Sequence, residues 1–383
     1  MKQTKGLLAF AISMMVFGAC QKDIQNSKAA NTSLQAQSND DLLADGEGHV
    51  FILSNQVSGN EVLAYKRAAD GTITYGAAYA TGGTGTGGGL GNQGAVIISQ
   101  DKQYLLAVNP GSSSISSLRI TNSGLELLST VSSGGTQPVS ITQHDGMVYV
   151  LNSGGDGNIS GFWFNGNGTL SPITNSTKPL SAIAAGAAQI SFVEEGKVLV
   201  ITEKATNTIT TYTIKNNGTP GVMHTLASSN PTPFGFAVGR NNIIYVSEAV
   251  GGALGASTLS SYFVAANGAV KLLTGPVGAF QSAACWVALT SDGKYAYTTN
   301  TASNNLSTFK ISGLGNIKVA AGIAALSGLG PIDADIDGAS KYLYVLNGGS
   351  HSISAYTIGT DAVLANLQTT EGLPVGATGL AAE

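Results

Sequence analysis

Seven short apolar stretches of the chain end in Asn or Glu, and each is followed by a polar loop and a second strand-like stretch. In each one, residues that favour β-strands run almost without interruption, as they do in buried strands. The stretches are Val50–Asn55, Tyr104–Asn109, Val148–Asn152, Leu199–Glu203, Ile244–Glu248, Ala296–Asn300 and Leu343–Asn347. Their last residues lie 43 to 54 positions apart. The chain therefore contains seven copies of one structural unit.

The residues between these stretches predict the other strands of each unit. After the Asn or Glu comes a segment in which apolar and polar residues alternate, as in a half-buried strand; examples are residues 115–120, 209–214, 306–311 and 353–358. Asn-Gly turns such as Asn167-Gly168 lead into a short outer strand, because both residues tolerate positive φ. Four strands per unit, repeated at this period, predict an all-β fold: a seven-bladed β-propeller of four-stranded blades.

The strand that leads each unit predicts how the ring closes. It begins near Gly94, Pro138, Gln189, Pro233, Trp286 and Pro331. The first unit, at Val50, has no such strand before it, whereas an unassigned strand-like segment lies at residues 373–382. We expect this C-terminal strand to complete blade one, because a closed ring leaves no free sheet edge.

The N-terminus has the features of an export signal. Lys2 and Lys5 precede an apolar stretch at residues 6–19, which is too short to span a bilayer permanently. Residues 17–20, Phe-Gly-Ala-Cys, resemble a bacterial lipobox, so we expect a lipoprotein signal peptide at 1–19 and lipidation of Cys20. An ordinary secretory signal with a chance cysteine is the alternative. Residues 20–47 then form a flexible tether, and residues 48–383 form the propeller.

Composition limits the partners that this chain is expected to bind. Only 10% of its 383 residues are charged, and the net charge is −4. No basic stripe is present, so a nucleic-acid partner is not expected. We expect a monomer that contacts the membrane only through its lipid anchor, at the outer membrane or cell surface, with the periplasmic face as the alternative.

Two acidic residues depart from the repeat. Glu203 and Glu248 stand where five other units have Asn, in the neighbouring fourth and fifth blades. Asn at a strand end is explained by local hydrogen bonds to the backbone, which the longer Glu side chain does not reproduce. Glu203 and Glu248 are therefore candidate catalytic residues for general acid–base chemistry. The alternative is that both are solvent-facing residues of the rim.

An alternating acidic run forms a second candidate site. Asp333 and Asp335 lie on a predicted innermost strand and project to one face of it. Residues 333–338 match the first half of a calcium loop, but Tyr344 stands where its Glu is expected. Solvation in the central channel, a backbone donor or a divalent cation such as Ca²⁺ or Mg²⁺ are the alternatives. No cofactor is required, and the metal ligands would be Asp333 and Asp335.

A glycine-rich segment fits a dinucleotide-binding pattern only formally. Residues 83–88 match its glycine spacing, but a strand follows them rather than a helix. No helix N-terminus is then present to hold a pyrophosphate. We interpret the segment as the loop that leads into the second blade.

The repeats resemble the seven-bladed β-propeller lactonases, which include propeller-type 6-phosphogluconolactonases and carboxymuconate-lactonizing enzymes. The resemblance covers about residues 48–383, and segments 88–109, 190–214 and 287–311 carry it. It implies a substrate pocket lined by groups at the starts of inner strands, together with the Glu at position 203. Cations are expected at those starts, but this chain has the neutral amides Gln93, Gln137 and Gln189 instead. Phe234, Trp286 and Asp333, on other inner strands, complete the binding candidates.

Two functions agree with these features. The first is a binding or scaffold module for a glycan, peptide or partner protein at the mouth of the propeller. The second, which the resemblance implies, is a lactonase or cycloisomerase that opens or forms the lactone ring of a sugar- or muconate-type acid. Because propellers serve both purposes, the fold does not decide between them.

Overall fold

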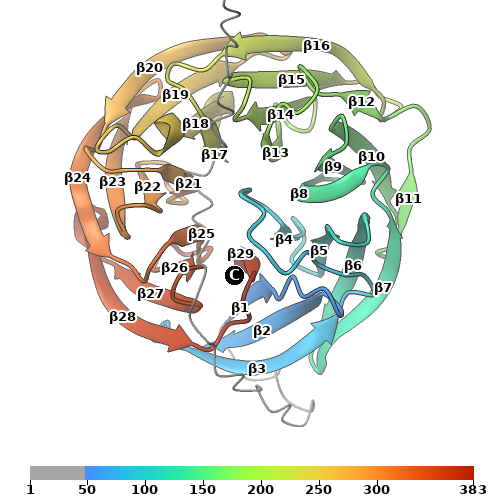
Figure 1. Ribbon diagram of the computed structural model, residues 1–383, viewed down its shortest axis with the longest axis horizontal. Helices are drawn as coiled ribbons and strands as arrows, with labels where there is room; N and C mark the ends of the chain where they lie inside the picture. Colours follow the sequence, from blue (N-terminus) through green and yellow to red (C-terminus); the bar gives the residue numbers. More distant parts are fainter. Residues whose placement is uncertain (1–47) are drawn as a thin grey trace, which may run out of the picture.

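The computed structural model describes residues 48–383, and these form seven sheets arranged in a ring (Figure 1). Within each sheet, neighbouring strands are antiparallel. The seven-bladed propeller predicted from the repeats is therefore confirmed. The predicted signal peptide, Cys20 and the tether lie outside the described residues. Residues 48–383 contain no helix that is both long and apolar enough to cross a bilayer.

The first four blades contain the chain from Gly48 to Ala227 together with the C-terminal strand, and in each one the strands are given from the innermost outward. The first sheet is β29 (Thr378–Ala382), β1 (Gly48–Leu53), β2 (Glu61–Arg67) and β3 (Ile73–Ala80). The second is β4 (Val96–Ile98), β5 (Tyr104–Asn109), β6 (Ser114–Thr121) and β7 (Gly124–Ser132). The third is β8 (Thr136–His144), β9 (Met147–Gly154) and β10 (Asn158–Phe164), with an outer strand in two pieces, β11 (Leu170–Pro172) and β12 (Lys178–Pro179). The fourth is β13 (Ala187–Val193), β14 (Val198–Glu203), β15 (Thr208–Ile214) and β16 (Pro220–Ala227).

The last three blades follow the same order. The fifth sheet is β17 (Pro233–Val238), β18 (Ile243–Glu248), β19 (Thr258–Val264) and β20 (Val270–Gly278). The sixth is β21 (Ala284–Leu289), β22 (Tyr295–Asn300), β23 (Asn305–Ser312) and β24 (Asn316–Leu326). The seventh is β25 (Pro331–Ile336), β26 (Tyr342–Asn347), β27 (Ser352–Ile358) and β28 (Leu364–Glu371). Three short 3-10 helices lie in turns: η1 (Arg240–Asn242), η2 (Val250–Gly252) and η3 (Thr360–Ala362).

The C-terminal strand closes the ring as predicted. β29 pairs antiparallel with β1, placing Phe51 opposite Ala381 and Val50 opposite Ala382. Figure 1 shows this strand at the inner edge of the first blade, with the C-terminus in the middle of the ring. Blade one is thus assembled from both ends of the described chain, which joins the first and last blades.

The recurring Asn has a structural role within its blade. In three blades its side-chain amide donates to the hydroxyl of a serine seven residues later, on the third strand. The bonded pairs are Asn109 with Ser116 (2.8 Å), Asn300 with Ser307 (2.8 Å) and Asn347 with Ser354 (2.9 Å). All three Asn side chains are fully buried. The repeated residue therefore fixes the loop between the second and third strands.

Candidate functional site

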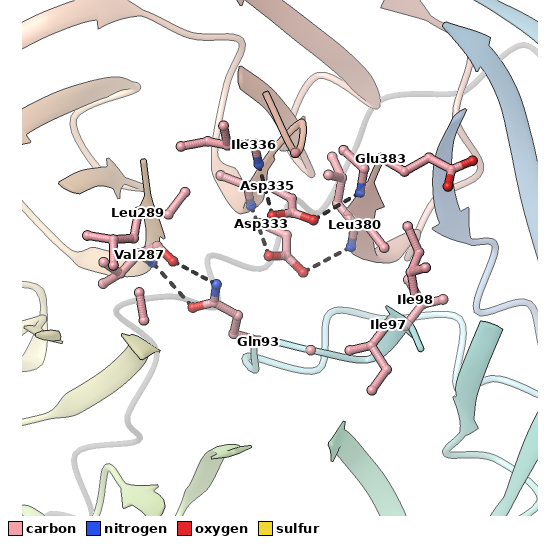
Figure 2. Close-up of a pocket in the computed structure, with 18 of the residues that line it drawn as sticks. Gln93, Ile97, Ile98, Val287, Leu289, Asp333, Asp335, Ile336, Leu380 and Glu383 are labelled. Carbon is pink, nitrogen blue, oxygen red and sulfur yellow. Dashed lines mark hydrogen bonds between the residues drawn. The ribbon is translucent and has the colours of Figure 1, made fainter. Parts of the chain in front are cut away.

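A cavity of about 440 Å³ lies in the central channel, among the innermost strands of six blades (Figure 2). Four of the residues proposed from the sequence line it: Gln93, Gln189, Asp333 and Asp335. They come from the second, fourth and seventh blades, and the ring brings them together. Apolar side chains such as Ile97 and Leu289 cover part of its wall. The volume is in the range of small-molecule sites.

The two glutamines hold neighbouring backbone across the inner edge of the ring. The Gln189 amide donates to the Phe236 carbonyl at 2.9 Å and accepts from the Phe236 N–H at 2.6 Å. Gln93 makes the same pair of bonds with Val287, at 3.0 and 3.3 Å. Both amides therefore satisfy strand edges that would otherwise face the channel unpaired. Gln93 and Gln189, two of the three neutral residues found where the resemblance implies cations, therefore have this structural use.

The two aspartates share the same wall and bind the closing strand. Each carboxylate accepts the N–H of the residue after it at 2.9 Å. Asp333 Oδ2 accepts a second bond from the Leu380 N–H at 3.1 Å, and Asp335 Oδ2 accepts one from the Ala382 N–H at 2.9 Å. Figure 2 shows the two side chains side by side, facing β29. The carboxylates thus link the seventh blade to blade one.

Burial changes the protonation of this pair. Burial raises the pKa of Asp335 to about 6, although two backbone N–H groups oppose the shift. The pKa of Asp333 is raised well above its usual value, chiefly by burial and further by the charge of Asp335. Both carboxyl groups therefore keep a proton to higher pH than an exposed aspartate does, and Asp335 is mostly ionised at neutral pH. Carboxyl groups whose pKa values are raised toward neutrality are suited to acid–base chemistry.

This arrangement predicts that Asp335→Asn stabilises the protein at alkaline pH. A pKa raised in the folded state favours folding at low pH, and this contribution is lost as the pH rises through about 6. We expect the variant to gain about 1–2 kcal/mol in free energy of unfolding at about pH 8, because part of the desolvation cost is offset by one lost hydrogen bond. Urea unfolding at several pH values measures this difference, which should disappear below about pH 4.

Asp70→Asn is the matched control for this measurement. The Thr72 hydroxyl and N–H lower the pKa of Asp70, which is fully exposed. The pKa shift of Asp70 is therefore opposite in sign to that of Asp335, and Asp70→Asn is expected to give no gain in stability at alkaline pH. If Asp335→Asn were no more stable than the wild type at any pH, the burial of a charged Asp335 would be contradicted.

Part of the cavity lining is exposed, and sequence reasoning missed these residues. Lys102 and Gly338 are exposed and lie in the turns that follow β4 and β25. Glu383, the residue after β29, lies beside them, where its side chain contacts His49 Nδ1 at 2.5 Å. A second hollow of about 370 Å³ adjoins this rim. The sequence signal that could have identified these residues is their position in the repeat. Turns that follow the inner strands lie at the same end of the channel.

Glu203 and Glu248 do not lie on the cavity wall. Both are fully buried at the ends of β14 and β18. Hydroxyl groups surround the Glu248 carboxylate, and burial raises its pKa. They belong to Thr258 (2.6 Å), Ser260 (2.8 Å), Tyr262 (3.0 Å) and Ser228 (3.1 Å). Glu203 accepts from the Ser181 N–H at 3.1 Å and the Thr206 hydroxyl at 3.0 Å. The bonds of Glu203 and Glu248 take the place of the hydrogen bonds that Asn makes at the same position of other blades, and several of them reach residues farther along the chain.

The remaining three candidates also lie away from the cavity. Gln137 is half-buried at the start of β8, with a φ of 53°. Phe234 and Trp286 are buried, and their rings pack at 5.0 Å between centroids. No cluster of three or more His, Cys, Asp or Glu side chains suited to a metal occurs within residues 48–383. A cation at Asp333 and Asp335 stays a prediction with only two protein ligands.

Sequence comparison matches residues 265–378 to the family described as Lactonase, 7-bladed beta-propeller. The resemblance to this lactonase family is confirmed. The matched segment reaches from the fifth blade through the seventh and includes both channel aspartates. No curated protein matches the chain significantly.

Solved structures show the same architecture as this lactonase-like propeller. A candidate 6-phosphogluconolactonase from Bacteroides uniformis has a TM-score of 0.69 and 18% identity, over 87% of this chain and 99% of that one. A periplasmic gluconolactonase from Pseudomonas aeruginosa has a TM-score of 0.66 and 15% identity, over 86% and 98%. A protein from Lactobacillus plantarum has a TM-score of 0.70 and 16% identity, over 88% and 99%. At these identities the likeness shows the fold alone.

Proposed function

We propose that this lactonase-like propeller hydrolyses a small lactone in its central channel, with Asp335 as general base and Asp333 as general acid. One observation carries the proposal: two carboxyl groups whose pKa values are raised by burial, Asp333 and the half-buried Asp335, line a cavity of ligand size. The family match over residues 265–378 supports lactone chemistry. A general base is most effective when its pKa lies near the working pH, and the Asp335 carboxylate meets this condition.

The proposed reaction uses the two carboxyl groups in sequence. Asp335 accepts a proton from water while the water oxygen bonds to the lactone carbonyl carbon. The ring C–O bond then breaks, and its oxygen takes the proton of Asp333. The product is the open-chain hydroxy acid, and proton exchange through solvent restores both groups. Residues two apart on one face of a strand are roughly 7 Å apart, which leaves room for a water and a ring atom.

Proton release from a panel of lactones tests this proposal. We expect the wild type to hydrolyse at least one uncharged sugar lactone, because the cavity wall is largely apolar and carries two carboxyl groups. Aliphatic lactones of similar volume are the comparison set. Absence of turnover across the panel would reject a hydrolase.

A non-catalytic binding module for a glycan, peptide or partner protein is the second candidate. One observation favours it: every carboxylate oxygen of Asp333 and Asp335 already accepts a backbone N–H. The pair would then hold the closing strand in place, as Gln93 and Gln189 hold theirs. Saturable binding without turnover in the same panel distinguishes this candidate.

We further propose that the protein is an envelope lipoprotein anchored through Cys20. Support comes from the sequence alone: the two lysines, the apolar stretch and the lipobox-like residues 17–20. The Cys20→Ser variant is expected to move from the membrane fraction to the soluble fraction after cell lysis. Unchanged membrane association of the variant would contradict lipid anchoring. A wild-type protein found wholly in the soluble fraction would do the same.

A further inference from the structure

The connection between β3 and β4 is more than twice as long as any other that leads into an inner strand. It has fifteen residues, 81–95, and the next longest, between β12 and β13, has seven. Eight of the fifteen are glycines. In Figure 1 the segment that precedes β4 runs into the middle of the ring. We call its residues 88–93 the plug.

The plug is bonded to blades that are distant from its own. Leu90 packs in the apolar cluster of the third and fourth blades. The Gly91 carbonyl accepts from Lys204 Nζ, in the fourth blade, at 2.5 Å. The Asn92 carbonyl accepts from the indole N–H of Trp286, in the sixth, at 2.5 Å. Two main-chain oxygens of the plug thus accept hydrogen bonds from side chains of two other blades.

The two donors share an aromatic partner under the plug. Lys204 Nζ lies 4.6 Å from the centre of the Phe234 ring, which packs against Trp286. No carboxylate within residues 48–383 forms an ion pair with Lys204. The adjacent Glu203 is bonded to hydroxyl groups instead. Burial lowers the pKa of Lys204 to about 8, since a carbonyl and a π face compensate its charge only in part.

We propose that Lys204 and Trp286 form a binding site for a small oxyanion, a carboxylate or phosphate group, which the plug keeps closed by filling it with the Gly91 and Asn92 carbonyl oxygens. An oxyanion forms a stronger, charge-assisted hydrogen bond with the ammonium than a neutral carbonyl does. Phe234 supplies an apolar wall for the rest of the ligand. Lys204, Phe234 and Trp286 do not line the cavity that contains the channel aspartates, although Gln93 of the plug does. Occupation of the site does not depend on the proposed hydrolysis.

The plug has the properties of a segment that can be displaced. Gly91 and the other glycines of the connection give its unfolded and open states wide conformational choice. The side-chain carbonyl of Asn92 is buried without a hydrogen-bond partner. Opening of the plug breaks the bond from the Asn92 amide to the Val139 carbonyl and the pair of bonds between Gln93 and Val287. Ligand binding must overcome the stability of the closed plug, and the observed affinity is reduced by the fraction of molecules that are open.

Trp286 fluorescence provides the test. The chain has two tryptophans, and the other, Trp163, is partly exposed on β10, so Trp163→Phe leaves Trp286 as the sole reporter. Inorganic phosphate and acetate are titrated separately into the full-length protein at constant ionic strength. We expect a saturable change in emission as the plug leaves the indole. Leu90→Ala, which removes the plug's apolar anchor, should tighten binding about tenfold.

Lys204→Met is the decisive variant, because it keeps an unbranched side chain, one atom shorter, and removes the charge. We expect it to abolish the response to both ions while the free protein keeps its native emission. If phosphate alone or acetate alone responds, that ion defines the ligand class. Asn92→Ala replaces Leu90→Ala if the latter fails to fold. No saturable response to either ion, or an equal response in Lys204→Met, would overturn the proposal.

Discussion

Deletion of residues 373–383 is expected to abolish soluble folding. The deletion removes β29, and with it every hydrogen bond that closes blade one from the inside. Leu373 and Leu380 are buried between the first and seventh blades, and their loss alone costs about 3–6 kcal/mol. That is comparable to the whole stability of a typical domain. The deletion also leaves Asp333 and Asp335 without the N–H donors of β29.

Soluble yield and size-exclusion elution measure this effect. Val375→Ala is the matched control within the same segment, because its side chain is more than half exposed and the substitution should be neutral. A peptide of residues 373–383 added during refolding should restore some soluble protein, since it supplies the missing strand. A truncated chain that stays monomeric and unfolds cooperatively would disprove closure by the C-terminus.

Asp335→Asn is expected to reduce lactone turnover by a factor of about 100 or more. The amide cannot accept a proton from water, although it has nearly the same shape as the carboxylate. The variant should remain folded, and at alkaline pH it should be more stable than the wild type. Loss of activity together with a gain in stability is the pattern expected of a residue retained for chemistry.

The control for this measurement is Glu203→Gln. Glu203 is buried among Ser181 and Thr206, away from the cavity, so the variant should keep most of its turnover wherever it is folded. Comparison of the two variants shows whether turnover depends on Glu203, which the sequence suggested as a catalytic residue, or on Asp335, which lines the central cavity. Full activity in Asp335→Asn, or its loss only in Glu203→Gln, would reverse the assignment.

The fold could be predicted from the sequence because the patterns that specify its strands and turns are local and occur in every blade. Strand alternation, turn residues and the unpaired segment at 373–382 each depend on a few neighbouring positions. The same local reasoning placed Asp333 and Asp335 on one face of an inner strand, where the structure has them.

The burial of the repeat-ending Glu residues could not be predicted in this way. Glu248 accepts bonds from residues 10 to 20 positions away, including Thr258 and Ser228. The pattern of residues along one strand does not identify hydrogen-bond partners on other strands and loops. Nor does it show that the glycine-rich loop crosses the ring to reach Lys204, more than a hundred residues later.

The rim of the cavity was missed for a different reason. Lys102 lies in a turn between strands, where lysine is common and needs no functional explanation. Its significance comes from the ring, which places Lys102 on the lining of the central cavity.

The dependence of kcat/KM for lactone hydrolysis on pH tests the central claim most directly. If Asp335 is the general base, activity should rise with pH along a limb with an apparent pKa near 6, the value to which burial raises this carboxyl. The limb should be absent from any residual activity of Asp335→Asn. A limb near the ordinary carboxyl pKa of about 4, or one near 6 that persists in the variant, would contradict catalysis by the channel aspartates.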